Sequence, residues 1–111
     1  ARAFAATLPF HVGRTFGGHS SCVEIEVSAP DSGSHDYILC DLGSGTRPFG
    51  GSVLARHGAT TPNTFHVFMS HLHWDHIMGF PLFTPAYIPG NLIRIYGCHA
   101  ALEDAFRAQH L

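Results

Sequence analysis

The sequence predicts an α/β fold with layered (α+β) architecture in a single domain over residues 1–111. Residues 21–27 alternate apolar and polar side chains, the period-two pattern of a strand with one buried face. Residues 64–69 form an almost continuous apolar run, typical of a strand buried on both faces of a layered sheet. Residues 47–57 lie between them and precede Gly58, so we expect a helix there.

The other segments fit this arrangement. Residues 29–36 are rich in turn formers, and residues 37–40 are predicted to form a second strand that pairs with residues 21–27 as a hairpin. Glu24 and Glu26 of the first strand should then face water.

Later in the chain, residues 92–96 are predicted to form a further strand, and residues 100–111 have helical composition. Gly50 and Gly51 weaken the helix predicted at 47–57, because glycine is a poor helix former. No internal repeat or linker divides the sequence.

Composition excludes several classes of function. Six Arg residues and no Lys face eight acidic residues, so the chain lacks an evident surface for gripping a large nucleic acid. Cys22, Cys40 and Cys98 include no C-x-x-C pair, which argues against a disulfide framework and a thiolate zinc site. A cytoplasmic protein is expected, with no segment long and apolar enough to span a membrane.

A cluster of potential metal ligands follows the predicted strand at 64–69. It comprises His71, His73, Asp75 and His76. Side chains alternate along an extended segment, so the first three should share one side, and a turn at Asp75 would bring in His76. Imidazole and carboxylate are suitable ligands for Zn²⁺ and also for Mn²⁺ or Fe²⁺. The competing interpretation is that these residues form a polar surface loop without a metal.

Residues 71–76, His71-Leu72-His73-Trp74-Asp75-His76, resemble the H-x-H-x-D-H motif of the metallo-β-lactamase superfamily. Residues 41–45 resemble the Asp-containing strand end that precedes this motif in the family, and residues 17–22 resemble the entry to its first core strand. The resemblance covers about residues 17–97. It implies that the fold is the first half of a metallo-β-lactamase αββα sandwich.

The resemblance also implies roles for individual residues. His71 and His73 would bind a first metal ion, and Asp75 and His76 a second, with two Zn²⁺ expected in a complete site. Asp41 would accept a ring N–H from a metal-bound histidine, although Asp41 could instead be a turn residue bonded to its own backbone.

Length is where the chain departs from the family, whose members have two similar halves that both supply ligands. We therefore expect a domain incomplete at its C-terminus, completed by a missing half or by a second copy in a homo-oligomer. As given, the chain should not hold two metal ions tightly, and the spacing of His99 and His110 does not support either as a replacement ligand. Half a sandwich should also expose an apolar face.

The function implied is that of a metal-dependent hydrolase that uses a metal-bound hydroxide. Asp75 would be both ligand and catalytic residue, orienting that hydroxide. The resemblance is greatest to the phosphodiesterase branch, which includes transfer-RNA 3′-processing nucleases, and a small or nucleotide-like phosphodiester is the expected substrate. Trp74 and Phe80 could stack on a base or could wall the core.

Two alternative functions remain open from the sequence. The same centre could hydrolyse a lactone, thioester or other acyl compound. Alternatively, the chain could be a non-catalytic binding or structural module that retains half of the fold.

Overall fold

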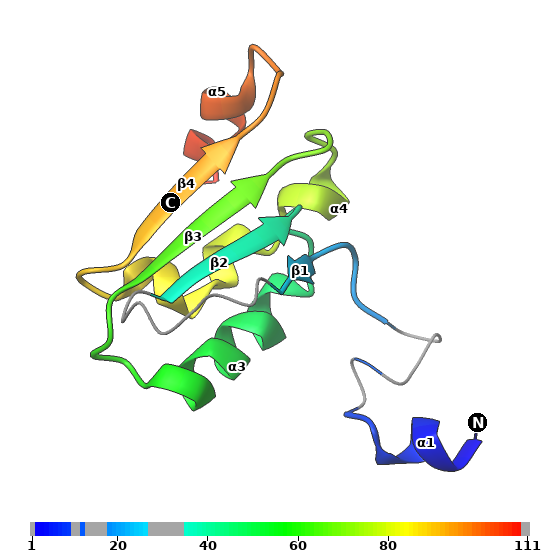
Figure 1. Ribbon diagram of the computed structural model, residues 1–111. Coiled ribbons are helices and arrows are strands. Elements are labelled where there is room, and N and C mark those ends of the chain that lie inside the picture. The colour runs from blue at the N-terminus through cyan, green and yellow to red at the C-terminus, as the bar shows by residue number, and fades with distance from the viewer. Residues whose placement is uncertain (1, 10–11, 13–17, 27–34, 110–111) are drawn as a thin grey trace.

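The computed structural model describes residues 2–9, 12, 18–26 and 35–109. Its centre is a four-stranded mixed sheet in the order β1-β2-β3-β4 (Figure 1). The strands are β1 (Val23–Ile25), β2 (His35–Cys40), β3 (Asn63–Phe68) and β4 (Leu92–Tyr96). β1 is antiparallel to β2, whereas β2, β3 and β4 are parallel. The molecule is therefore a mixed α/β fold, as the sequence predicts.

Helices connect the parallel strands, because a parallel pair needs a crossover rather than a tight turn. α3 (Thr46–His57) joins β2 to β3, and α4 (Trp74–Ile77) with the 3₁₀ helices η1 (Phe80–Leu82) and η2 (Thr84–Tyr87) joins β3 to β4. α5 (Leu102–Arg107) follows β4, and α1 (Arg2–Thr7) lies near the N-terminus. α3 contacts η1 and η2, and the three lie on one side of the sheet (Figure 1).

Most predicted elements are confirmed with small shifts of boundary. The strands predicted at 64–69 and 92–96 are β3 and β4, and the helix predicted at 47–57 is α3, which ends with Gly58 at φ 71°. The hairpin is β1 with β2, although its turn at residues 27–34 lies outside the described residues. The C-terminal helix is shorter than predicted, and Gly50 and Gly51 are accommodated within α3.

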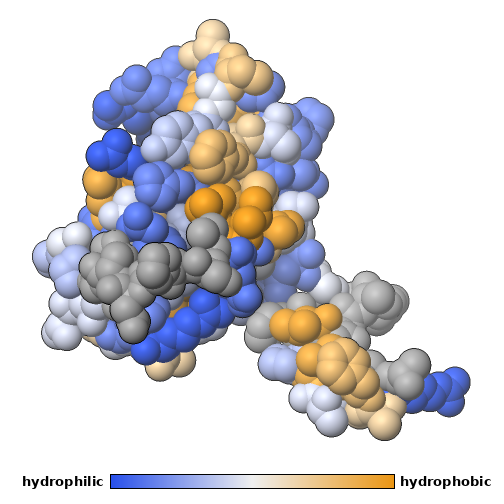
Figure 2. Space-filling model, in the orientation of Figure 1, coloured by the Kyte–Doolittle hydropathy of each residue, from blue (hydrophilic) through white to orange (hydrophobic). Residues whose placement is uncertain are grey.

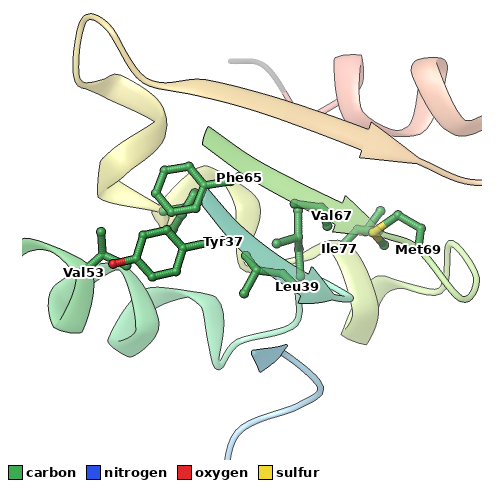
Figure 3. Packing of buried hydrophobic residues seen from close by; sticks show 9 residues of the cluster. Tyr37, Leu39, Val53, Phe65, Val67, Met69 and Ile77 are labelled. Atoms are coloured by element: carbon green, nitrogen blue, oxygen red, sulfur yellow. The ribbon is translucent and has the colours of Figure 1, made fainter. Parts of the chain in front are cut away.

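The core lies between the sheet and α3. Tyr37, Leu39, Phe65 and Val67 are buried on β2 and β3, and Figure 3 shows Tyr37 beside Val53 of α3 and Val67 beside Ile77 of α4. Phe83, between η1 and η2, packs edge-on against Phe65, with ring centroids 5.0 Å apart. Burial of each large apolar side chain contributes about 1.5–3 kcal/mol, so this layer stabilises the platform on which the loops at the strand ends are mounted.

β3 is buried on only one face, which corrects the prediction of burial on both. Phe65 and Val67 point into the core, whereas Phe68 is 48% exposed on the opposite face. The difference has a simple physical cause: α3, η1 and η2 cover one face, and within the described residues no element forms a layer on the other.

The orientation predicted for β1 is wrong at Glu24, although Glu26 is exposed as expected. Glu24 points toward α3 and accepts hydrogen bonds from Arg56 at 2.9 and 3.3 Å. Val23 and Ile25 face away from the helix and are exposed. β1 does alternate as the sequence predicts, but its inner face carries an ion pair because Arg56 reaches β1 from the last turn of α3.

The side of the sheet that the described helices leave uncovered, hereafter the open sheet face, exposes apolar side chains together with polar ones. Its strand register aligns one residue from each strand in a row, namely Val23, Cys40, Phe68 and Tyr96. The next row holds Ile25 and Ile38 together with His66 and Arg94. Figure 2, in the orientation of Figure 1, shows hydrophobic side chains gathered over this part of the molecule between more polar margins. Val23, Ile25, Phe68 and Tyr96 are therefore exposed large apolar side chains of the sheet.

Within the described ranges, every helix is too short or too polar to cross a lipid bilayer.

Candidate metal centre

The ligand cluster lies where the parallel strands β2 and β3 both end. Loops beyond the carboxyl ends of parallel strands are the usual place for binding sites in α/β folds. Asp41 directly follows β2, and its N–H donates to the Phe68 carbonyl at the end of β3 at 3.0 Å. Met69 then bonds to Tyr96 of β4, so the start of the His-rich loop is tied to the sheet on both sides.

Three of the four predicted ligands converge. His71, Asp75 and His76 each offer one ligand atom, and these atoms all lie within 4.8 Å of one another. The rings of His71 and His76 have centroids 3.8 Å apart, and His76 Nε2 lies 3.5 Å from Asp75 Oδ2. The two histidines are half-buried and Asp75 is exposed. Two imidazoles and a carboxylate arranged in this way could hold a metal ion.

His73 lies beside this group but outside it. Its ring is 4.7 Å from that of His71, and its side chain is exposed. The cause is local: the backbone is extended only as far as His73, and α4 starts at Trp74. The first turn of α4, rather than continued alternation, therefore carries Asp75 and His76 toward His71.

Asp41 is the carboxylate that connects the loop after β2 to the ligand histidines. It is buried, and it accepts hydrogen bonds from the Ser70 N–H at 2.8 Å and the Ser70 hydroxyl at 2.6 Å. His76 Nδ1 lies 2.8 Å from Asp41 Oδ2. These contacts are what a residue that orients a histidine requires, and none of them is to the backbone of its own turn.

The environment of Asp41 favours its ionised form. Burial acts to raise the pKa of this carboxyl, but hydrogen bonds from the Ser70 hydroxyl and N–H, together with His76, outweigh burial, so the net pKa is lower than usual. The backbone of Asp41 has φ 64°, a left-handed conformation that costs a non-glycine residue about 1–2 kcal/mol. The hydrogen bonds offset that cost.

Two glycines allow the loop after β2 to lie directly on α4. Leu42 N donates to the His76 carbonyl at 2.8 Å, and Gly79 N donates to the Leu42 carbonyl at 2.9 Å. A Cβ at Gly43 would lie 2.5 Å from the Asp75 carbonyl oxygen, and one at Gly79 would collide with the Gly43 carbonyl. The ligand-bearing turn is therefore clamped by backbone contacts that only glycine permits.

The sequence left open whether Trp74 and Phe80 stack on a base or wall the core, and the two residues differ in the structure. Phe80 is half-buried and packs edge-on against Phe106 of α5, with centroids 5.3 Å apart, so it belongs to the core. Trp74 is 63% exposed and does not wall the core. It lies between His73 and Asp75 at the start of α4 and is available to a ligand.

Ser70 and His99 make contacts next to the centre that the sequence did not predict. Ser70 contacts both Asp41 and His71, its hydroxyl lying 3.0 Å from His71 Nδ1. His99 Nε2 lies 3.3 Å from the Ser70 carbonyl but is not among the three grouped ligands. Ser70 is adjacent to the motif, and only the tertiary pairing of β2 with β3 reveals its partner. His110 lies outside the described residues.

Comparisons of the chain with protein-family models, with curated proteins and with solved structures each found no match.

Proposed function

We propose that this chain provides the first half of the metal centre of a hydrolase of the metallo-β-lactamase superfamily. The observation that carries the proposal is the convergence of His71, Asp75 and His76 at the strand ends, with Asp41 bonded to His76 from the neighbouring strand. The H-x-H-x-D-H pattern alone allowed a polar surface loop. A surface loop would not need a buried carboxylate to hold one of its histidines.

The open sheet face supports the same proposal at the level of the fold. In an αββα sandwich each sheet carries helices on its outer face and meets the second sheet on its inner face. Here one face is covered by α3, η1 and η2, while the other exposes apolar side chains such as Val23 and Phe68. A second layer, from a further half of the domain or from a second copy, would cover that face.

The chemistry follows from the donor set. When bound, Zn²⁺, or alternatively Mn²⁺ or Fe²⁺, supplies a water of lowered pKa and neutralises charge on the attacked group, with two ions in the complete centre. His71 and His76 would hold the metal through ring nitrogens. Asp75, which is exposed, would serve as a ligand and would orient the attacking water. His73, whose ring centroid lies 4.7 Å from that of His71 but which is outside the three-residue group, would be a further ligand.

A small or nucleotide-like phosphodiester is the proposed substrate. Trp74 offers an exposed indole next to the ligands, and aromatic rings of this kind stack on bases with a gain of about 1–3 kcal/mol. The chain has six Arg and a formal net charge of −2, so it offers little attraction to a long nucleic acid. Recognition would then depend on the centre and its immediate surroundings.

The first experiment measures bound metal per chain by mass spectrometry after loading with Zn²⁺. Because the ligand set is incomplete, we expect the wild type to bind Zn²⁺ only weakly, and His71→Ala and Asp75→Ala to lose that binding. His66→Ala is the matched control, because His66 bonds to Tyr96 on the open sheet face. Equal metal content in all four proteins would contradict the proposed site.

A second experiment compares substrates with the metal-loaded protein. Model phosphodiesters should be cleaved faster than model lactones, thioesters and other acyl esters, and Asp75→Ala should lower that rate by about 10²–10⁴-fold. Preference for acyl compounds would instead select acyl hydrolysis. A biological activity unaffected by Asp75→Ala would point to a non-catalytic module.

A further inference from the structure

Four side chains from two strand ends form one continuous hydrogen-bonded chain. It runs from His76 Nδ1 to Asp41 Oδ2 at 2.8 Å, from Asp41 Oδ2 to the Ser70 hydroxyl at 2.6 Å, and from that hydroxyl to His71 Nδ1 at 3.0 Å. Both ends of the chain are histidines of the three-residue ligand group. Asp41 and Ser70 thus connect two ligands that do not bond directly to each other.

The donor and acceptor roles along this chain can be assigned from the number of protons available. An ionised carboxylate only accepts, so His76 must donate its Nδ1–H to Asp41. The 2.6 Å contact has the length of an O–H···O⁻ bond, so the single proton of the Ser70 hydroxyl goes to Asp41. The hydroxyl oxygen can then only accept from His71, which must also carry its proton on Nδ1.

We propose that Ser70 is a positioning residue that, with Asp41, holds both His71 and His76 in the Nδ1–H tautomer. A neutral imidazole protonated on Nδ1 has its lone pair on Nε2. In His76 this nitrogen lies 3.5 Å from Asp75 Oδ2, within the ligand group. The inference deepens the proposed function, since it assumes that the two rings bind metal. It assigns the preparation of both ligands to one carboxylate and one hydroxyl.

The Ser70 hydroxyl has a role separable from that of the Ser70 backbone. The backbone N–H donates to Asp41 Oδ1 at 2.8 Å and would do so with any side chain at this position. Only the hydroxyl reaches His71. Ser70 is exposed, so Ser70→Ala should fold normally, and Ser70→Thr keeps the hydroxyl group.

The decisive experiment reads histidine tautomers directly, by long-range ¹H–¹⁵N correlation NMR of the metal-free protein. The wild type should show His71 and His76 as Nδ1–H. Ser70→Ala should release His71 into a tautomer mixture while leaving His76 unchanged, and Ser70→Thr should restore His71. Ser52→Ala on α3 is the matched control and should leave both rings as in the wild type.

Asp41→Asn gives a sharper outcome, because an amide can donate where the carboxylate only accepts. With its carbonyl oxygen kept on the Ser70 N–H, its NH₂ group would face His76 Nδ1 and the Ser70 hydroxyl. His76 must then accept at Nδ1, and Ser70 becomes free to donate to His71. Both rings should switch to the Nε2–H tautomer.

Metal binding provides the functional readout. Partners of metal ligands typically change affinity by about 10–100-fold, so Ser70→Ala should weaken Zn²⁺ binding in that range, with Ser70→Thr close to the wild type and Asp41→Asn weaker than both. An unchanged His71 tautomer in Ser70→Ala would overturn the role of Ser70. A wild type that binds no Zn²⁺ would instead overturn the proposed function, and the tautomer spectra would still decide which residue orients which ring.

Discussion

At residue scale, Asp41 joins a buried carboxylate to a left-handed backbone. Asparagine tolerates that conformation and keeps a hydrogen-bonding side chain, whereas alanine does neither. Glycine tolerates the conformation without a side chain, so comparing Asp41→Gly with Asp41→Ala isolates the backbone. We expect Asp41→Ala to lower the free energy of unfolding by about 1 kcal/mol or more beyond Asp41→Asn. Urea unfolding of both variants and of Asp41→Gly provides the measurement. If Asp41→Gly were no more stable than Asp41→Ala, the backbone would contribute little.

The cysteines provide a second residue-scale prediction. Cys22 is half-buried, and burial raises the pKa of its thiol, whereas Cys98 is exposed. Because the thiolate is the reactive form, iodoacetamide at about pH 8 should alkylate Cys98 first and Cys22 slower by roughly tenfold or more. Peptide mass spectrometry at successive times measures both rates, with urea-unfolded protein as the control. Equal rates in the folded protein would show that the β1 entry is open to solvent.

At element scale, the clamp between the loop after β2 and α4 depends on close backbone contact. Gly79→Ala would place a methyl group against the Gly43 carbonyl, so the clamp must open. We expect a loss of stability of about 1–3 kcal/mol and weaker Zn²⁺ binding together, because the turn that carries Asp75 and His76 moves with the clamp. Thermal unfolding and metal titration test the two effects on the same sample.

Gly51→Ala is the matched substitution within α3. A Cβ at Gly51 meets nothing within 4 Å, and the residue is exposed inside the helix. Alanine should therefore stabilise the protein by about 0.5–1 kcal/mol through helix propensity, without an effect on Zn²⁺ binding. A loss of stability in this variant would mean that α3 is shorter in solution than Thr46–His57.

At the scale of the whole molecule, the two faces of the sheet should respond to substitution in different ways. Phe65→Ala removes a fully buried ring from the core, and we expect it to lower the free energy of unfolding by about 3–5 kcal/mol. Phe68 lies on the same strand but on the open sheet face, so Phe68→Ser should lower the free energy of unfolding far less. Chemical unfolding of the pair compares them directly.

The open sheet face also predicts self-association of the 111-residue chain. Phe68→Ser should shift light scattering toward a smaller species, because it interrupts the apolar row formed with Val23, Cys40 and Tyr96. Leu82→Ser provides a control, since Leu82 is similarly exposed but lies on η1. A wild type that is monomeric at high concentration would contradict this prediction.

The positions of the helices and strands could be predicted from local sequence pattern. Which face of a strand is buried could not. The apolar run at 64–69, the helix at 47–57 and the strand at 92–96 all lie within about one residue of β3, α3 and β4. Period and turn residues are local properties, so they can be read along the chain. Which side of β1 meets a helix depends on where Arg56 lies in space. The sequence therefore predicts a solvent-facing Glu24, whereas the structure turns Glu24 toward α3.

The sequence by itself determined an α/β chain with potential metal ligands placed directly after a strand, because hydrophobic period and ligand chemistry are both properties of neighbouring residues. The tertiary structure alone decided that His71 groups with Asp75 and His76 rather than with His73, since that choice depends on where α4 begins. It alone also paired Asp41 with Ser70 and His76. Asp41 is 29 positions from Ser70 and 35 positions from His76 in the sequence. These residues meet only because β2 and β3 are parallel neighbours that end at the same edge of the sheet.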